Sequence, residues 1–362
     1  MPEWSRTSLA GRLFDAPLRG SCLFAVGALL ALAPLRFGIG PLPQAGQAGG
    51  GPAHAVPEQP AQTDAALARL RKPGSPFVLR LNRFFWSDGE AGVKRYLRLA
   101  RRFGRLGYEI ELQVRYHPSR AQEGDLAAWR AHVREVVSRF GAIRAVVSLQ
   151  IANEVNLTFS PDSSDGAFDR APEALVQGVV AAKREVRREH LSRRLKIGFN
   201  WFWRLDDATE RRFWNALRDD GGRRFARAVD WIGLDAYPGT VYPPVVSEGG
   251  ERAAIADALR SVRSFARVPG IPRSTPIHVE ENGWPTLLPQ RGYAEQARRL
   301  RRMVRAVSDL RGRYGVTDYR WFNLRDADSA SDVLFQHFGL LESGYDPKPA
   351  FRAYRELVRE LG

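Results

Sequence analysis

The feature that most constrains the fold is a regular alternation of short and long hydrophobic patterns over residues 77–361. Short runs rich in β-branched and aromatic residues predict seven strands, at 77–82, 108–118, 143–156, 195–203, 229–239, 276–283 and 317–328. Each run is followed by a stretch with helical spacing; at 293–314, Leu300, Val304 and Val307 lie at i, i+4 and i+7. Because a strand joined to a parallel neighbour needs a crossover, this alternation predicts a parallel sheet covered by helices.

We predict a closed (β/α)8 barrel, since an alternation of this length matches that architecture. Only seven strands are visible, so the first strand is either cryptic or missing, and the sequence AHAV at 53–56 offers a short candidate. The alternative fold is an open, doubly wound sheet. The sequence disfavours it, because no GxGxxG motif and no phosphate-binding P-loop follows an early strand.

Residues 1–37 are predicted to be an export signal or an uncleaved membrane anchor. Arg6, Arg12 and Arg19 precede the apolar run CLFAVGALLALAPL, which is short for a membrane-spanning helix. Cys22 stands before this run, whereas a lipoprotein cysteine would follow it, so we do not expect lipidation. The protein is therefore expected to be exported, either secreted or associated with the cell envelope.

Two further segments complete the predicted organisation. The stretch 38–63 is rich in Pro, Gly, Ala and Gln and has little to bury, so we predict a flexible linker. Residues 64–362 are predicted to form the barrel, and we expect it to act as a monomer.

Composition narrows the classes of function. The chain has 55 basic residues, of which five are lysines and 50 arginines, and its net charge is +15. The arginines are spread along helical stretches and no nucleic-acid-binding motif is present, so we do not expect a nucleic-acid partner. One cysteine and six scattered histidines, without an HExxH motif, predict neither a metal site nor a cofactor.

Polar and aromatic residues gather where the predicted strands end. In parallel barrels the active site lies at the carboxyl ends of the strands. The residues at these ends are Arg80, Asn82, Tyr116, His117, Asn153, Glu154, Asn200, Trp201, Trp203, Asp235, Tyr237, Glu280, Glu281, Trp321 and Asn323. Acids, amides and aromatic rings at one rim are typical of a site that binds sugars.

Two strand ends carry glutamates, Glu154 and the pair Glu280–Glu281. Cleavage of a glycosidic bond needs two carboxyl groups, one to protonate the leaving oxygen and one to attack the anomeric carbon or activate water. The indole rings of Trp201, Trp203, Trp284 and Trp321 could stack against sugar rings, although each ring alone is as well explained by core packing.

The motifs IANEV (151–155) and EENGWPT (280–286) resemble two segments of the large clan of retaining glycoside hydrolases with (β/α)8 barrels. There, the acid/base glutamate follows an asparagine at the end of the fourth strand, and the nucleophile ends the seventh. The second motif is closest in form to β-1,3-glucanases and β-glucosidases. The two motifs are three strand–helix units apart, as in that clan, which implies that the first strand is the one not seen.

The resemblance implies roles for three residues. Glu154 would be the general acid/base and Glu281 the nucleophile of a retaining glycosidase acting on β-linked glycans without a cofactor. Asn153 would bind the 2-hydroxyl of the sugar.

The resemblance also implies substrate-binding and supporting residues. Tyr237 would steady the nucleophile, and Arg80 would favour its ionised form. His117 would end the third strand as a polar contact, and Trp321 would form the floor of the sugar subsite. Trp201 and Trp284 remain candidates for stacking against the sugar.

Two departures from the clan's pattern support an alternative function. The first motif reads Asn-Glu-Val where Asn-Glu-Pro is frequent, and Glu280 stands where a neutral residue is usual. The alternative is a catalytically weak or inactive barrel that binds extracellular or cell-wall polysaccharide, or one whose basic helices contact anionic polymers. Strand alternation predicts that Glu280 points away from Glu281, toward an arginine in the helix layer.

Overall fold

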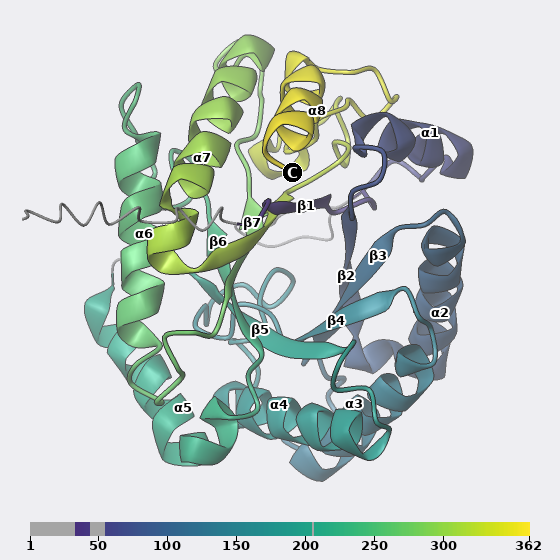
Figure 1. The fold of residues 1–362 in the computed structure, drawn as a ribbon, viewed down its shortest axis with the longest axis vertical. Helices are drawn as coiled ribbons and strands as arrows, with labels where there is room; N and C mark the ends of the chain where they lie inside the picture. Colours follow the sequence, from purple (N-terminus) through teal and green to yellow (C-terminus); the bar gives the residue numbers. More distant parts are fainter. Residues whose placement is uncertain (1–32, 44–54, 205) are drawn as a thin grey trace, which may run out of the picture. The chain divides into compact units, whose positions relative to one another are not determined.

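The computed structural model describes residues 33–43, 55–204 and 206–362. In this part of the chain eight parallel strands close into a barrel in the order β1 to β8, and helices surround it (Figure 1). The predicted (β/α)8 fold is confirmed. The strands are β1 (Arg36–Ile39), β2 (Val78–Phe85), β3 (Glu109–Arg115), β4 (Val146–Ile151), β5 (Lys196–Phe202), β6 (Trp231–Ala236), β7 (Ile277–Asn282) and β8 (Val316–Trp321).

The helices follow the strands along the chain. They are α1 (Pro60–Leu70), α2 (Gly89–Arg105), α3 (Leu126–Gly141), α4 (Ala171–Arg188), α5 (Asp207–Ala226), α6 (Glu251–Phe265), α7 (Tyr293–Tyr314) and α8 (Pro349–Leu361), with short 3₁₀ turns η1 (Trp86–Asp88) and η2 (Leu334–Gln336). Local signals set their ends. The Asp125 carboxylate caps α3 by accepting the N–H groups of Ala127 and Ala128, and α7 ends at Gly315, whose φ is 66°.

The strand that the sequence concealed is β1, which pairs with β2 on one side and β8 on the other. It has four residues, and a Cβ on Gly38 would lie 2.2 Å from the Val78 carbonyl oxygen, so only glycine fits. A four-residue strand with an obligatory glycine carries too weak a pattern to predict.

The position of β1 corrects two predicted boundaries. The barrel begins before residue 64, because β1 lies at Arg36–Ile39 and α1 starts at Pro60, inside the predicted linker. The candidate AHAV does not supply the strand: Ala55 and Val56 have no strand conformation. Most of the predicted export segment, residues 1–32, lies outside the described residues. Among the helices that the structure describes, none is both long and apolar enough to span a bilayer.

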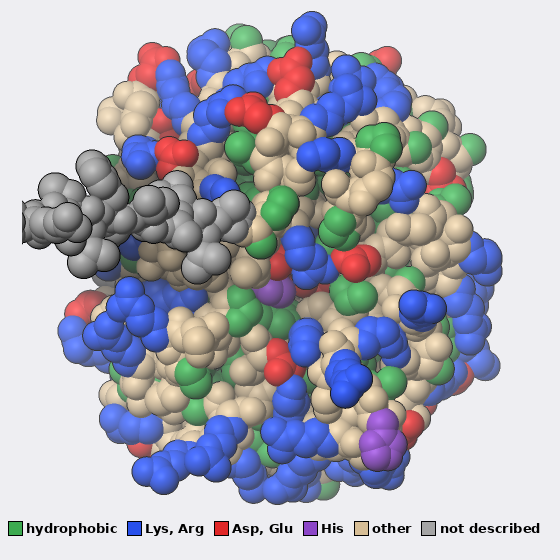
Figure 2. Space-filling view, in the orientation of Figure 1, with side chains coloured by type: hydrophobic (Ala, Val, Ile, Leu, Met, Phe, Trp, Pro, Cys, Tyr) green, Lys and Arg blue, Asp and Glu red, His purple; other side chains and the backbone are tan. Residues whose placement is uncertain are grey.

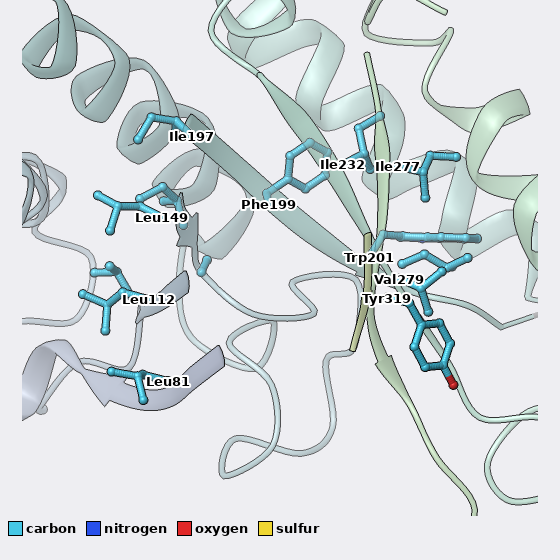
Figure 3. Packing of buried hydrophobic residues seen from close by; sticks show 14 of the residues in the cluster. Leu81, Leu112, Leu149, Ile197, Phe199, Trp201, Ile232, Ile277, Val279 and Tyr319 are labelled. Atoms are coloured by element: carbon cyan, nitrogen blue, oxygen red, sulfur yellow. The ribbon is translucent and has the colours of Figure 1, made fainter. Parts of the chain in front are cut away.

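The hydrophobic core lies between the barrel and its helices. Successive strand residues face opposite sides of a sheet, and the apolar ones face outward. Figure 3 shows part of this layer, in which Leu81, Leu112, Leu149, Ile197, Phe199 and Trp201 project from neighbouring strands. All six side chains are fully buried.

The inside of the barrel is polar instead. Buried inward-facing residues include Arg80, Glu111, Gln113, Gln150, Asn200, Glu280, Asp318 and Arg320. Barrel interiors are more often filled by branched apolar side chains. A charged interior of this kind is favourable only where each charge has a partner, so the barrel lumen provides fixed donors and acceptors beneath the strand ends.

On the outer surface, lysines and arginines are distributed around the face shown in Figure 2. Many pair with carboxylates on a neighbouring helix: Arg305 of α7 donates two hydrogen bonds to Glu360 of α8, both of 2.8 Å. Such exposed pairs each contribute little to stability, about 0–1 kcal/mol. Much of the arginine content is thus located on solvated helix faces.

Candidate active site

The carboxyl ends of the strands surround a cleft. Glu154 and Glu281 lie in it. One wall is polar and comes from β2 and β3; its residues are Asn82, Arg83, Gln113 and Arg115. The facing wall is aromatic and comes from β5, β6, β8 and the loop after β8; its residues are Phe202, Tyr237, Phe322, Phe335 and Phe338.

Glu281, near the end of β7, is held by donors from β2 and β6. The Tyr237 hydroxyl donates to its Oε2 at 2.5 Å, and the Arg80 guanidinium donates to its Oε1. Asn82 Nδ2 lies 3.4 Å from the same oxygen. These contacts, all on buried residues, fix the carboxylate of Glu281 in one orientation at the cleft floor.

The two strongest partners of Glu281 stay protonated. Burial first, and then the charge of Glu281, raise the pKa of Tyr237 well above its ordinary value. Burial lowers the pKa of Arg80, but the carboxylates of Glu281, Asp235, Glu280 and Glu111 outweigh this effect and the net shift is upward. Both groups therefore remain donors to Glu281 at any pH at which the protein is folded.

Glu154 lies in the loop directly after β4, two residues beyond Ala152, and the backbone of this segment is strained. Its φ is 45° and that of Ala152 is 59°, values that residues other than glycine rarely adopt. The Glu154 N–H donates to Asn200 Oδ1 at 2.9 Å, which helps to hold this conformation. Burial, and next the charge of Glu281, raise the pKa of Glu154 to about 8. The Glu154 carboxyl group is thus protonated near neutral pH.

Asp235, at the end of β6, brings a third carboxyl group to the same point. One oxygen from each of Glu154, Asp235 and Glu281 lies within 4.8 Å of the others. Burial, and then the charges of Glu281 and Glu154, raise the pKa of Asp235 well above its ordinary value. Burial and mutual repulsion thus favour the protonated forms of Glu154 and Asp235, beside the contact between Arg80 and Glu281.

Asn153 is the centre of an amide network that joins β3, β4 and β5. Its Oδ1 accepts from Gln113 Nε2 at 2.8 Å, Gln150 Nε2 at 3.1 Å and Asn200 Nδ2 at 2.8 Å. Its Nδ2 donates to the Ser163 carbonyl oxygen at 2.7 Å. The network fixes the strand end that carries Glu154, and the side chain of Asn153 also lines the cleft.

Five of the predicted site residues do not line the cleft, and one of them, Arg80, lies beneath Glu281 and donates to its carboxylate. His117 is half-buried outside it, packed between the rings of Phe85 and Phe168 with centroid distances of 4.4 and 4.8 Å. Its Nδ1 lies 3.3 Å from the Ser87 hydroxyl oxygen. The polar residues that β3 presents to the cleft are Gln113 and Arg115, which lie on the same side of the strand.

The three predicted tryptophans are core residues. Trp201 points into the helix layer, where its Nε1 donates to Glu210 Oε2 at 2.5 Å. Trp321 is fully buried, and its Nε1 donates to the Phe338 carbonyl oxygen at 3.3 Å. Trp284 lies under the Arg291 guanidinium, 3.8 Å from the ring centroid. None of the three contacts the cleft.

The aromatic wall is built from the residues next to two of these tryptophans. Because side chains alternate along a strand, Phe202 faces the cleft where Trp201 faces outward, and Phe322 does so next to Trp321. Phe159, 70% exposed, stands at the rim in the loop between β4 and α4. Counting strand parity from Asn200 and Arg320 would have identified both inward-facing phenylalanines from the sequence.

Glu280 is placed differently from the prediction. The register of β7 shifts against both neighbours near this residue, so Glu280 faces the barrel interior like Glu281. It does meet an arginine, but inside the barrel: Arg80 Nε lies 3.2 Å from Glu280 Oε2 and 3.5 Å from Glu111 Oε1. The guanidinium of Arg80 thus connects the Glu281 carboxylate above with two carboxylates below.

A buried histidine completes this lower network. His278 Nδ1 lies 3.2 Å from Glu280 Oε1, and its Nε2 lies 3.3 Å from Asp318 Oδ2. Burial opposes the charge of His278, but Asp318 and its other acidic neighbours outweigh this and raise its pKa to about 9. Burial and Glu111 raise the pKa of Glu280 to about 7. His278 is therefore a cation shared between carboxylates.

Two groups of the described residues bring three metal-ligand atoms within 4.8 Å of one another: Glu111, His278 and Glu280, and Glu154, Asp235 and Glu281. In both groups Arg80 already provides the neighbouring positive charge. Arg80 thus pairs with Glu111 and Glu280 in the first group and with Glu281 in the second.

Comparison with known proteins identifies the fold. No protein-family model matches the chain, and neither does any curated protein. The GH5_18 protein from Bifidobacterium longum subsp. longum, solved with Manβ1-4GlcNAc, aligns with a TM-score of 0.60 at 17% identity, over 82% of this chain and 72% of its own. A fungal β-1,4-galactanase aligns at 0.56 and 15% identity over 82% and 91%, and an apo β-glucosidase at 0.56 and 18% identity over 83% and 87%. At these identities the likeness shows a shared barrel fold.

Proposed function

We propose that this protein is a glycoside hydrolase that cleaves β-linked glycans with retention of configuration. The observation that carries the proposal is the facing pair Glu154 and Glu281, whose nearest carboxyl oxygens lie within 4.8 Å of each other. In retaining glycosidases the two carboxyl groups are about 5–5.5 Å apart, whereas inverting enzymes need about 6.5–9.5 Å to admit a water between them.

The environments of the two glutamates divide the roles. Glu154 carries a proton near neutral pH, because burial and the charge of Glu281 raise its pKa to about 8. Glu281 receives hydrogen bonds from a cationic guanidinium and a phenol. A pair of carboxyl groups in environments that differ in this way supports one acid and one nucleophile.

The proposed reaction has two displacements. In the first, Glu281 attacks the anomeric carbon while Glu154 gives its proton to the departing glycosidic oxygen, which leaves a glycosyl ester on Glu281. In the second, Glu154 takes a proton from water, whose oxygen attacks the anomeric carbon and releases Glu281. The two steps need no cofactor, and Glu154 ends protonated as it began.

The aromatic wall supports a sugar substrate. Phe202, Phe322 and Phe338 present apolar rings across the cleft from the amides of Asn82 and Gln113. A sugar has an apolar face of C–H groups and an equatorial rim of hydroxyls, so it can contact both walls at once. The solved β-galactanase and β-glucosidase that share the fold are named for sugar-cleaving activities, which agrees with the proposal. We further propose that the substrate is extracellular, in keeping with the N-terminal sequence.

Incubation with activated 2-fluoro glycosides of several sugars, followed by mass spectrometry, tests the proposal. A covalent label on Glu281 in the wild-type protein, absent from Glu281→Gln, is the expected result. If wild-type hydrolysis rates of aryl glycosides survive both Glu154→Ala and Glu281→Ala, the assignment is wrong. Glycan binding without label or turnover would favour the alternative of a binding protein.

A further inference from the structure

The polar wall of the cleft contains two arginines that the proposed mechanism does not use. Arg83 and Arg115 both line the cleft. Their guanidinium carbons lie 5.1 and 5.3 Å from the centroid of the same ring, Phe85. Two guanidinium groups are thus held near one ring, and their mutual repulsion costs free energy unless each has an anionic partner.

Arg115 is neutralised by the protein but keeps an unused donor. Its Nε donates to Asp165 Oδ1 at 2.6 Å, while Asp165 Oδ2 accepts the N–H groups of Tyr116 and Asn153, both at 2.8 Å. Arg115 is 2% exposed, and its Nη2 has no hydrogen-bond partner among the described residues. A buried guanidinium donor without an acceptor is uncommon, because desolvation without a hydrogen bond is unfavourable.

Arg83 has no carboxylate partner. It forms no ion pair with any residue that the structure describes. Its Nη1 lies 3.5 Å from the Asp162 carbonyl oxygen. The carboxyl group of Asp162 lies along the same cleft, but not within ion-pair distance. Burial, and next the charge of Arg115, lower the pKa of Arg83 from its ordinary value. The charges of Asp162 and Asp88 act in the opposite direction, but neither carboxylate forms an ion pair with this half-buried guanidinium.

The backbone places Arg83 in the cleft. The register of β2 against β3 is irregular between Leu81 and Phe84, and Arg83 has a φ of 64°. Its N–H donates to Gln113 Oε1 at 2.9 Å, which holds the irregular turn. Bulges of this kind re-aim a side chain and are common beside active sites.

We propose that the cleft takes sugars that carry an anionic substituent, a carboxylate or a sulfate, bound by the Arg83 guanidinium, with the buried charge of Arg115 beside it. This deepens the proposed function, on which it rests for turnover but not for binding. A planar guanidinium matches both oxyanions through paired N–H donors. Neutral sugars would leave the Arg83 guanidinium without an anionic acceptor, so the cleft should discriminate against them.

The experiment compares three aryl β-glycosides that differ only at C6: the glucuronide, the glucoside 6-sulfate and the glucoside, with the matching galacto series. We expect one of the two anionic substrates to have the highest kcat/KM, and which one it is identifies the substituent. In Arg83→Gln its KM should rise at least about tenfold, whereas KM for the neutral glycoside should change less than about twofold. Arg83→Lys keeps the charge and should retain part of the preference.

Arg120→Gln is the matched control, because Arg120 is exposed near the same rim, does not line the cleft and undergoes the same change of charge. It should leave all constants unchanged. Wild-type preference for the neutral sugar, or equal effects of Arg83→Gln on charged and neutral substrates, would overturn the proposal.

Calorimetric binding of phenyl 1-thio-β-D-glucuronide, which resists hydrolysis, and of the corresponding thioglucoside separates this proposal from the proposed function. Binding of the uronide that depends on Arg83, without turnover of any substrate, keeps this inference and rejects the glycosidase. Turnover with a label on Glu281, but without a preference for anionic substrates, keeps the glycosidase and rejects this inference.

Discussion

The Tyr237 hydroxyl donates a hydrogen bond of 2.5 Å to Oε2 of Glu281. Tyr237 directly follows β6 and Glu281 lies in β7, so two adjacent strands of the barrel set the contact. The Arg80 guanidinium occupies the other oxygen of Glu281. The proposed nucleophile is thus held at both oxygens before the substrate arrives, and that positioning can be removed one donor at a time.

Tyr237→Phe removes a single hydroxyl from this arrangement. Hydrogen bonds to charged groups contribute about 1.5–3 kcal/mol, so we expect kcat for aryl glycosides to fall about 10- to 100-fold. Steady-state kinetics with thermal unfolding will check this. Tyr242→Phe is the matched control, since Tyr242 packs on Trp203 and does not line the cleft. Equal rates in the two variants would contradict the role of Tyr237.

The pKa of Glu154 predicts a limit to activity at alkaline pH. In the proposed mechanism Glu154 must be protonated in the first step, and its raised pKa of about 8 means that the protonated form dominates below that pH. We expect kcat/KM to be maintained toward neutral pH and to fall as the pH rises through about 8. In Glu154→Gln this alkaline limb should disappear, and substrates with poor leaving groups should lose more rate than activated ones. A limb that persists unchanged in Glu154→Gln would assign it to another group.

The buried cation His278 predicts that stability falls in mild alkali. Its folded pKa of about 9 lies above its ordinary value of 6.5, so the folded state binds the proton more tightly. The stabilisation is therefore full below pH 6.5 and is lost as the pH rises through about 9. The raised pKa of Glu280 acts in the same direction, because its protonated form is also favoured by folding.

Urea unfolding at pH values from 6 to 10 measures this loss, which we expect to be about 1–3 kcal/mol and smaller in His278→Gln. His132→Gln is the contrasting control. Burial lowers the pKa of His132 to about 4, from an ordinary value of 6.5, so above about pH 8 it is neutral in both the folded and the unfolded state. Its replacement should therefore leave the slope between pH 8 and 10 unchanged. A wild-type stability that does not depend on pH between 6 and 10 would show that His278 does not carry this charge.

Most of the barrel was predictable because its signal is periodic. The stretch 293–314, with its helical spacing, is observed as α7 at Tyr293–Tyr314. The four-residue β1 was not predictable, because a strand of this length containing Gly38 has no readable alternation. Its place is set by tertiary contacts with β2 and β8, which no local pattern reports.

The site was predictable where motif and strand parity agree. Glu154, Glu281, Arg80 and Tyr237 meet at one point as expected from the ends of their strands. The position of Arg83 in the cleft could not be predicted, because its side-chain direction depends on an irregular register in β2 that has no sequence signal. The tryptophans were misplaced for a different reason: a residue at a strand end can face either way, and size alone does not tell which.

Trp201 and Phe202 are adjacent in β5 and face opposite sides of the barrel wall, so replacing each one tests this alternation directly. Trp201 is fully buried in the helix layer, so Trp201→Ala should lower the free energy of unfolding by about 3–5 kcal/mol. Phe202→Ala removes part of the cleft wall, and its main effect should be a higher KM for glycosides. Chemical denaturation and kinetics of both variants check this. If Trp201→Ala raised KM at wild-type stability, the tryptophan would be the sugar platform after all.

The concealed strand gives the last prediction. A methyl group at position 38 would lie 2.2 Å from the Val78 carbonyl oxygen and 2.6 Å from Arg320 Cδ. The backbone atom cannot move without disturbing the pairing of β1 with β2, so we expect Gly38→Ala to cost at least about 1–3 kcal/mol of stability. Gly292→Ala is the matched control, because a Cβ there meets nothing within 4 Å. If both variants melt at the wild-type temperature, residues 36–39 do not close the barrel; if only Gly38→Ala melts early, the strand is an integral part of it.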